Sequence, residues 1–538
     1  MRPGTLPGVL SIRRQKRGCP WCKQLTRLLR ASFADHETEN IPKGCSLNTR
    51  SVSHPFLTDH KATTFSLRPY RGENAPLRYL LPVQARFCNL ESSKHGYLPF
   101  SRAIDPSSFD YGMINKNIKL CQSEHAMCGS STCREFTPTR LIDCKTRVLR
   151  AAPNCQYVCL SYVWGDESTE NAASNSQMLA NIPQTVSDAM FVTLKLGMRY
   201  LWVDRYCIDQ ENREEKHDAI RNMDSIYREA FVTIIAAAGS GSEYGLPGVS
   251  RPRKATPFVN IGSHAFVAMN DPFIDMETSV WNTRGWTYQE MLFSRRRIIF
   301  TDYQVYFQCR AHQTMEQLDT TFESADLTKL ITRNRPFFPT QKESFTIDDL
   351  YFRLEEYYPR TLRYETDNIN AFDGVFRQLS DRTSNGRGRA HESMPGLYMT
   401  RRNPHFYGIP LWLQESEVTD NPETSVLWQS PEISDDDKVS LRFGIDLGWK
   451  VETRDMDISS THAGVLVKPN FPSWSWASTK SWNHKHGRCR IRFSGRPDVI
   501  RETQNAYFIA SVTHKSGQHM SMLDYTAQAD DYTLFHPW

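Results

Sequence analysis

Side chains suited to binding a nucleotide stand directly after two predicted strands of this sequence. Trp164, Gly165 and Asp166 follow the first strand, and Asp204 and Arg205 follow the second. A tryptophan ring can stack on a base, a carboxylate can accept hydrogen bonds from ribose hydroxyls, and a guanidinium can bind a pyrophosphate through two hydrogen bonds. Glycine lets the backbone approach a ligand closely. These residue types in these positions predict a ligand-binding edge.

Short runs of β-branched and aromatic residues predict the strands that position these side chains. The runs cover 156–164, 199–204 and 231–238. Helical signals separate them: one helix opens at Pro183, and a second spans 212–230 with its apolar residues on one face. This alternation is typical of a parallel sheet with helices on both faces, so we expect an α/β fold.

The chain beyond the third strand predicts further elements around the same sheet. They are a glycine-rich loop, an inserted hairpin, a short helix and two short strands, over 239–248, 259–269, 281–295 and 296–309. Ligands of open parallel sheets bind at the carboxyl ends of the strands. We therefore expect the loops after the three strands to share one rim, where Arg284 joins Arg205 as a pyrophosphate ligand.

Several of these residues also have a purely structural interpretation. Trp164 and Trp202 fit a packed core, because large aromatic rings are mostly buried. Asp204 fits capping or turn hydrogen bonds with Asn212 and its neighbours. The sequence leaves both interpretations open.

Composition and charge exclude several classes of protein. The chain has 538 residues, 39% of them hydrophobic, which excludes a wholly disordered protein and predicts two or three domains. Residues 1–34 contain eight basic residues and no acidic one, so the remaining 57 basic against 60 acidic residues leave a net charge of −3. The body is therefore not a nucleic-acid platform. The basic start leaves a mitochondrial presequence or an arm for an anionic membrane open.

No membrane-spanning or secretory signal stands out. The longest apolar run, 231–238, is far shorter than a membrane span, and the start of the chain lacks the apolar core of a signal peptide. We expect a cytoplasmic protein without a transmembrane segment.

Changes in pattern along the chain predict its organisation. We expect a basic, loosely ordered N-terminal region over 1–75, a mixed lead-in over 76–145 and the α/β domain over 146–310. A linker over 311–345 and an α+β region of short strands over 346–538 follow.

One cluster of possible metal ligands lies in the lead-in. Cys121, His125, Cys128 and Cys133 offer the nitrogen and sulfur ligands that zinc requires. Their spacings are irregular, and a helix with two buried thiols explains them as well. We assign no metal from the sequence and leave the zinc question open.

Three blocks in fixed order give the chain a resemblance to a known family. They are the strand CLSYVWGD, the segment LWVDRYCIDQ with its following helix, and the block NTRGWTYQEMLF, which together fall within about 155–310. They resemble the SYxWG, WxDxxCIxQ and RxWTxQE blocks of the fungal heterokaryon incompatibility (HET) domain. The flanking segments PTRLIDC, DNINAFDGV, YGIPLWL and FPSWSWAS resemble regions of full-length family members.

The resemblance implies both a fold and a biological role. HET domains resemble Toll/interleukin receptor (TIR) domains in fold, which implies a TIR-like parallel sheet flanked by helices. They act as cell-death effectors when genetically different fungal hyphae fuse, which implies self-association and an unknown protein partner. Some TIR domains hydrolyse NAD, so NAD is implied as a substrate and no resident cofactor is required.

The resemblance also implies a catalytic residue. TIR-type NAD hydrolases place a catalytic glutamate four residues after a tryptophan, and Trp286 and Glu290 stand in that relation. The resemblance therefore also makes Trp286 a predicted ligand-binding residue. A carboxylate beside the ribose can stabilise the cation that forms when nicotinamide leaves. The alternative is that Glu290 pairs with Arg284 while Trp286 packs in the core. A second match to the spacing, Trp428–Glu432, lies outside the family blocks.

The sequence therefore predicts a fungal incompatibility and programmed cell-death effector that cleaves NAD through Glu290. A non-catalytic, self-associating interaction module is the alternative. An accessory protein of a metabolic gene cluster is a more distant one.

Overall fold

The computed structural model divides the chain into two units, each described here by itself. The first comprises Met1–Asn282 and Glu290–Thr340, and the second comprises Thr283–Gln289 and Gln341–Trp538. The residues that the structure describes are 9–10, 45–53, 61–69, 78–82, 84–89, 94–99, 101–129, 137–165, 179, 181–256, 258–261, 264–318, 332, 335–340, 347–384, 397–399, 405–406, 409–414, 442–443, 449–453, 489–493, 511–513 and 519–521. Asp166, Cys133 and the Trp428–Glu432 pair lie outside them.

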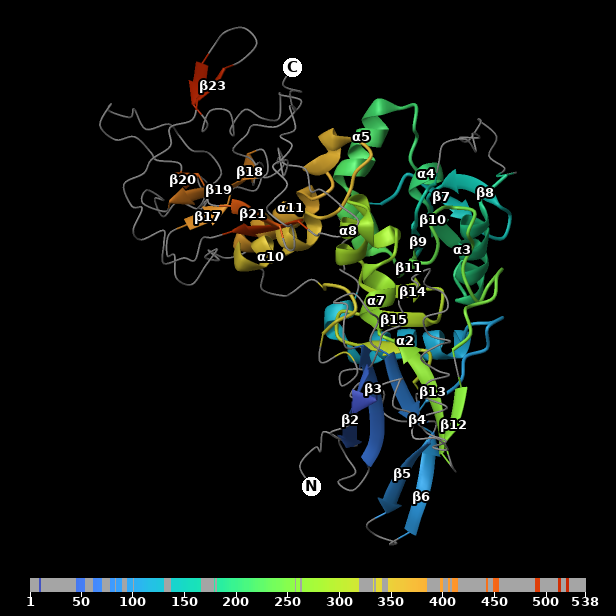
Figure 1. Ribbon diagram of the computed structural model, residues 1–538. Coiled ribbons are helices and arrows are strands. Elements are labelled where there is room, and N and C mark those ends of the chain that lie inside the picture. Colours follow the sequence, from blue (N-terminus) through green and yellow to red (C-terminus); the bar gives the residue numbers. More distant parts are fainter. Residues whose placement is uncertain are drawn as a thin grey trace. The chain divides into compact units, whose positions relative to one another are not determined.

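A mixed sheet forms the core of the first unit (Figure 1). Its strands are β7 (Arg140–Asp143), β8 (Val148–Ala151), β9 (Val158–Ser161), β10 (Tyr200–Trp202), β11 (Val232–Ala236), β14 (Arg296–Phe300), β15 (Val305–Cys309) and β16 (Gln313–Met315). The spatial order is β16-β15-β14-β11-β9-β10-β7-β8. The inner strands β14, β11, β9 and β10 pair in parallel, and the outer ones pair antiparallel.

The central strands are buried along their whole length. Every residue of β9, β11 and β14 is buried. Parallel strands covered on both faces consist of near-continuous apolar runs, which is why VCLS and VTIIA show no polar alternation. The predicted α/β class and the predicted strands are confirmed.

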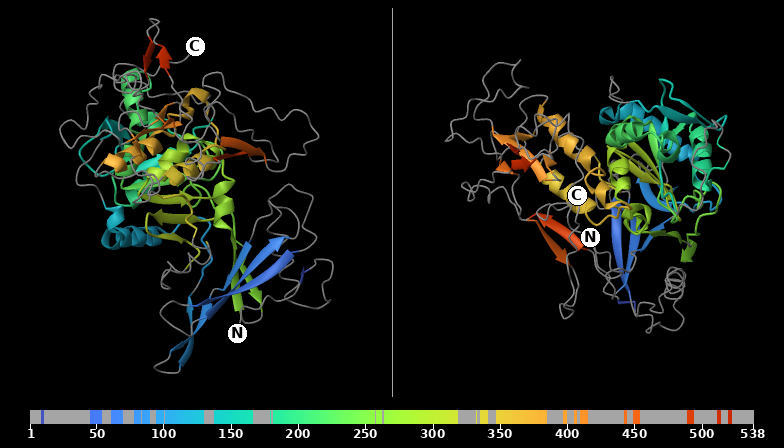
Figure 2. Two further views of the ribbon diagram at one scale, coloured as in Figure 1. Left: turned by 90° about the vertical axis from the view of Figure 1, so that its left-hand side faces the viewer. Right: turned by 90° about the horizontal axis from the view of Figure 1, so that it is seen from above.

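Helices cover both faces of this sheet, as the view from above in Figure 2 shows. The helices of the first unit are α2 (Tyr111–Glu124), η1 (Ala126–Cys128), α3 (Gln184–Lys195), α4 (Asp204–Cys207), α5 (Arg213–Arg221), α6 (Met223–Glu229) and α7 (Pro272–Glu277). Two more, η2 (Trp281–Thr283) and α8 (Trp286–Phe293), continue across the division between the units.

The strand order determines which face each helix covers. β10 and β11 lie on opposite sides of β9. Crossover connections between parallel strands are right-handed, so the connections β9-α3-β10 and β10-α5-α6-β11 must cover opposite faces. Figure 1 shows α3 and α5 on opposite sides of the strands. From β9 the chain continues to β10 on one side, whereas from β11 it continues to β14 on the other side. The direction of the connections therefore reverses between β9 and β11. Open α/β sheets bind ligands outside the carboxyl ends of the strands at this kind of reversal.

The long helix predicted over 212–230 is two helices. Asn212 caps α5 by accepting hydrogen bonds from the backbone N–H groups of Glu214 and Glu215. The helix then ends at Asn222, whose φ and ψ of −102° and 17° depart from helical geometry, and α6 begins at the next residue. The break separates an exposed, charged helix from a buried one, since most of α6 is buried.

The loop after β11 is tied to α3. Asp188 of α3 accepts hydrogen bonds from the Leu246 backbone N–H at 2.6 Å and from the Ser250 hydroxyl at 2.5 Å. The Gly245 N–H donates to Thr185 Oγ1 at 3.1 Å. These bonds set the shape of the glycine-rich loop at the carboxyl edge of the sheet.

A second sheet in the first unit joins the start of the chain to the inserted hairpin. Its strands are β1 (Val9–Leu10), β2 (Cys45–Ser53), β3 (Lys61–Pro69), β4 (Arg78–Pro82), β5 (Gln84–Asn89), β6 (Lys94–Pro99), β12 (Phe258–Ile261) and β13 (His264–Asn270). The predicted hairpin is confirmed as β12 and β13, and β13 pairs antiparallel with β4 (Figure 2).

The second unit contains helices and short antiparallel strands. They are α10 (Ile347–Tyr357), η3 (Glu365–Asn368), α11 (Asp373–Ser384), β17 (Leu397–Met399), β18 (His405–Phe406), β19 (Ile409–Gln414), β20 (Arg442–Phe443), β21 (Trp449–Thr453), β22 (Cys489–Phe493), β23 (Ser511–Thr513) and β24 (His519–Ser521). Buried rings form an aromatic core here. The Phe372 ring centre lies 6.0 Å from Tyr288, 5.0 Å from Tyr357 and 5.2 Å from Phe376.

No helix in the described part of the chain has both the length and the hydropathy needed to cross a membrane.

Replacing Asp188 should loosen the loop over 239–248. In Asp188→Ala the buried Leu246 N–H loses its charged acceptor, which costs about 1.5–3 kcal/mol. We expect faster amide hydrogen exchange at Leu246 and an unchanged rate at the β11 amides. Equal exchange at Leu246 in both proteins would show that Asp188 does not hold the loop.

Asp143 should make stability depend on pH in the acidic range. Hydrogen bonding to the Arg199 guanidinium, 2.6 Å away, is the main cause that lowers the pKa of this carboxyl to about 2. A depressed folded-state pKa stabilises the fold above the unfolded value of about 3.9, and this contribution is lost as the pH falls towards 2.

The measurement compares Asp143→Asn with the natural protein. The variant should melt at a lower temperature at pH 7, and the gap should narrow as the pH falls from about 4 to 3. Asp218→Asn, at an exposed aspartate of α5, serves as the control. A gap that does not change with pH would contradict the assignment.

Candidate functional site at the carboxyl edge of the sheet

Glu290 lies in a buried hydrogen-bonded chain at the end of β9. Its side chain is 5% exposed. Ser161, the last residue of β9, donates its hydroxyl to Glu290 Oε2 and accepts a hydrogen bond from Trp281 Nε1 at 2.8 Å. The carboxylate is therefore held by a hydroxyl whose own orientation is set by the indole N–H.

The carboxylates of Glu290 and Asp204 both contribute to the raised pKa values of two neighbouring buried side chains. Burial, followed by these two carboxylates, raises the pKa of Tyr227 well above its ordinary value. The pKa of Cys159 is raised by burial, then by Cys207, Glu290 and Asp204. Both carboxylates thus lie within electrostatic range of the same two buried groups, which places them in one region of the domain.

Trp164, Asp204 and Arg205 form a contact cluster after β9 and β10. The Trp164 indole N–H donates to both Asp204 carboxylate oxygens, at 3.1 and 2.9 Å. The Arg205 backbone N–H donates to Asp204 Oδ1 at 2.7 Å, and its guanidinium lies 5.9 Å from the Trp164 ring centre. Trp164 is half-buried. The ring therefore presents its polar edge to Asp204 and is not a fully packed core residue.

Trp202 differs from Trp164, because it belongs to the core. It is 1% exposed and its ring meets Tyr227 edge-on, with 5.5 Å between the ring centres. The structural interpretation is confirmed for this residue.

The loops after the three strands converge. Gly165 has a φ of +84°, and a Cβ at this position would lie 3.6 Å from the Ser242 nitrogen in the loop after β11. That φ favours glycine. Among the causes that raise the pKa of Tyr206, after burial, is the charge of Glu243. The loop after β9 thus approaches the loop after β11, and Tyr206 after β10 lies within electrostatic range of Glu243 in that loop.

Comparison with known proteins matches this same region. Residues 157–290 match the heterokaryon incompatibility protein (HET) family. The match begins one residue before β9 and ends at Glu290, so it spans the convergent loops described above. Residues 157–290 of this chain are therefore identified as a HET domain.

A curated relative supports the assignment. The chain is similar to heterokaryon incompatibility protein 6, OR allele, of Neurospora crassa, with 30% identity over 98 residues. The similarity covers 16% of this chain and 14% of that protein. No solved structure matches the chain, so the likeness of the HET domain to TIR domains stays a prediction.

Two of the predicted ligand residues belong to the second unit. The Arg284 carbonyl accepts hydrogen bonds from Thr287 Oγ1 at 2.8 Å and from Arg360 Nη1 at 3.1 Å, and its backbone bridges to Thr361. Trp286 begins α8 and is half-buried. Their roles at a ligand stay predictions, as does that of Asp166, which lies outside the described residues.

Sequence reasoning missed Ser161 and Trp281 as partners of Glu290. Ser161 is separated from Glu290 by 129 positions and from Trp281 by 120. The available signal was a serine at the end of an otherwise apolar strand, since a buried hydroxyl requires a partner. That signal predicts a partner but cannot say which one.

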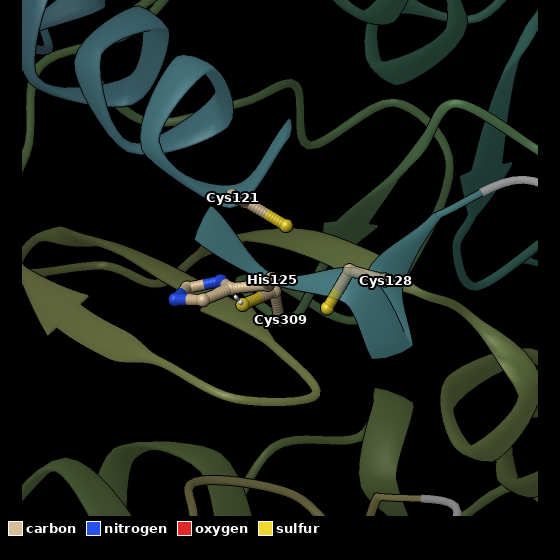
Figure 3. Close-up of side chains that lie close together, drawn as sticks. All are labelled: Cys121, His125, Cys128 and Cys309. Carbon is tan, nitrogen blue, oxygen red and sulfur yellow. Dashed lines mark hydrogen bonds between the residues drawn. The ribbon is translucent and has the colours of Figure 1, made fainter. Parts of the chain in front are cut away.

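A separate cluster of sulfur and nitrogen atoms lies near the opposite edge of the sheet. Cys121, His125, Cys128 and Cys309 offer ligand atoms that all lie within 4.8 Å of one another (Figure 3). Hydrogen bonds from Cys121 and then Cys309 lower the pKa of the Cys128 thiol. The sequence also allowed a single helix with two buried thiols. Both thiols are buried, but Cys121 lies in α2 and Cys128 in η1, and Cys309 was not foreseen.

Ser161 and Glu290 should be energetically coupled. Removing the hydroxyl leaves a buried carboxylate without this donor, and a hydrogen bond to a charged group contributes about 1.5–3 kcal/mol. A double-mutant cycle of Ser161→Ala and Glu290→Gln, followed by denaturant unfolding, should give a coupling energy of that size. The control cycle pairs Ser161→Ala with Glu229→Gln and should be additive within about 0.5 kcal/mol. Additivity in both cycles would contradict the coupling.

Proposed function

We propose that this protein acts in fungal heterokaryon incompatibility as a cell-death effector, and that its HET domain cleaves NAD or a related nucleotide through Glu290. The first part is supported by the family match over 157–290 and by the Neurospora relative, which is named for incompatibility. The second part depends on the geometry around one carboxylate.

The observation that carries the proposal is the position of Glu290. Its carboxylate bonds to Ser161 at the carboxyl end of β9, beside the point where the strand order reverses. Open α/β sheets bind ligands at this point. A buried carboxylate held by a fixed hydroxyl is also pre-oriented, which favours stabilisation of charge that develops during a reaction.

The chemistry requires little beyond that carboxylate. The bond between ribose C1′ and the nicotinamide nitrogen breaks, and its electron pair neutralises the pyridinium ring. The cation left on the ribose is stabilised by the anionic carboxylate. Water then adds to C1′ and releases a proton to solvent. No general acid is needed, because nicotinamide leaves as a neutral molecule.

Burial sets a condition on this activity. At 5% exposure, Glu290 can meet a ribose only after the covering side chains move. Trp164 and Asp204 are hydrogen-bonded to each other, so they too must rearrange before either can bind a ligand through these groups. We therefore expect turnover to depend on a conformational step such as assembly.

A second function is favoured by the same burial. Glu290 already has a hydrogen-bond donor, and Trp164 and Asp204 satisfy one another, so the residues form a stable arrangement without a ligand. This arrangement fits a non-catalytic module that acts in incompatibility by associating with itself or with another protein.

Measurement of NAD consumption separates the two functions. Purified natural protein is assayed at high concentration beside Glu290→Gln and Glu290→Ala, and assembly is followed by light scattering. We expect turnover in the natural protein and a loss of at least about 100-fold in both variants, the scale of removing an electrostatic catalytic group.

The matched control is Glu229→Gln. Glu229 is a buried glutamate of the same domain, 9% exposed, at the end of α6 where β11 begins, and hence at the opposite edge of the sheet. It should retain turnover. Absence of turnover in assembled natural protein would reject NAD cleavage and favour the interaction module, whereas equal turnover in the Glu290 variants would reject the role of Glu290.

A further inference from the structure

Three cysteines and a histidine meet at the edge of the sheet opposite to Glu290. Cys121 lies in α2, His125 follows that helix, Cys128 ends η1, and Cys309 ends β15 (Figure 3). Cys309 pairs with Arg296 at the start of β14, and this pairing places the cluster at the amino edge of the parallel strands. The cluster is therefore separate from the carboxyl-edge site.

The geometry matches the requirements of one tetrahedral ion. The four ligand atoms lie within 4.8 Å of one another, and His125 Nδ1 lies 3.3 Å from Cys309 Sγ. Zinc bonds of about 2.3 Å to sulfur and 2.0–2.1 Å to nitrogen place tetrahedral ligand atoms about 3.3–3.8 Å apart. The observed set needs only small adjustments to reach these distances.

The burial and redox state of the thiols point the same way. Cys121, Cys128 and Cys309 are 1%, 0% and 3% exposed, and all three are free of disulfides. His125 is half-buried. Sulfur and imidazole ligands favour zinc over calcium or magnesium, which prefer oxygen. Four protein ligands leave no open coordination position, which is typical of a structural zinc site.

Hydrogen-bond donors around the cluster would stabilise the negative charge of a zinc site with three thiolates. Three thiolates around Zn²⁺ carry a net charge of −1, and the buried guanidinium of Arg296 lies beside them. Its Nε donates to Cys121 Sγ at 3.1 Å and its Nη2 donates to the Cys128 carbonyl at 3.1 Å. The His312 backbone N–H donates to Cys309 Sγ at 3.2 Å. Outer donors of this kind orient metal ligands and tune their affinity.

We propose that Cys121, His125, Cys128 and Cys309 bind one structural zinc ion that ties α2 and η1 to the end of β15. The ion links segments about 180 positions apart and fixes the lead-in helix to the edge of the HET-domain sheet. Because no preformed site exists in the unfolded chain, zinc binding adds directly to folding stability.

The proposed ligand set differs by one residue from the cluster seen in the sequence. The sequence offered Cys133 as the fourth ligand, whereas the structure brings in Cys309 from a distant strand. Cys133→Ser and Cys309→Ser therefore test the assignment against each other.

The experiment measures zinc in the full-length protein purified without chelators. Elemental analysis should give about one zinc per chain, the stoichiometry of a four-ligand structural site. Cys309→Ser should lose the zinc, while Cys133→Ser and the control Cys144→Ser, at a buried free thiol elsewhere in the unit, should keep it. Arg296→Met should weaken zinc affinity about 10–100-fold.

A conservative variant guards against loss of zinc through misfolding. Cys309→His restores a zinc ligand and should regain bound metal and the melting temperature. Cobalt substitution of the natural protein should give the intense visible bands of tetrahedral cobalt with thiolate charge transfer.

Three results would overturn the site. The first is natural protein that contains no zinc and takes up none on titration. The second is zinc lost in Cys133→Ser and kept in Cys309→Ser. The third is an iron–sulfur absorption spectrum with iron in place of zinc.

Discussion

The central strands of the HET-domain sheet must be covered on both faces, and the rest of the domain follows from this constraint. β9 and β11 expose no side chain to water, so apolar helices must pack on either side. Right-handed connections then send α3 to one face and α5 and α6 to the other. The loops that carry polar groups lie at the ends of the strands, so the candidate sites are found at the two edges of the sheet.

Two of the polar side chains that enter this core have well-defined partners. Ser161 bridges Trp281 and Glu290. Arg297, 1% exposed, donates to Gln308 Oε1 at 3.0 Å. An unpaired buried charge would cost several kcal/mol, so such groups persist only where a partner has been provided. Apolar side chains at these positions would need no hydrogen-bond partner. Buried polar side chains of this kind occur at both edge sites.

Local sequence patterns predicted most helices and strands of the domain, but few of the side-chain contacts between them. Strands and helices between 156 and 309 follow from apolar runs and capping residues such as Asn212, because these act over a few neighbouring positions. The break at Asn222 was missed, since the apolar side of the helical pattern runs through it. Trp164 and Asp204 could be placed at strand ends, but their hydrogen bond to each other could not be predicted.

The sequence by itself determined the α/β class, the order of the central elements, the resemblance of the central region to the HET domain, and the carboxyl-edge position of Trp164 and Asp204. These depend on residue types and short spacings that a linear chain displays directly. Only the tertiary structure decided that Ser161 and Trp281 hold Glu290, and that Cys309 completes the cluster begun by Cys121. The physical reason is distance along the chain. Ser161 and Glu290 are 129 positions apart, and Cys309 is about 180 positions from the other ligands, so neither contact leaves a periodic pattern in the sequence. The pairing of the strands brings these residues together.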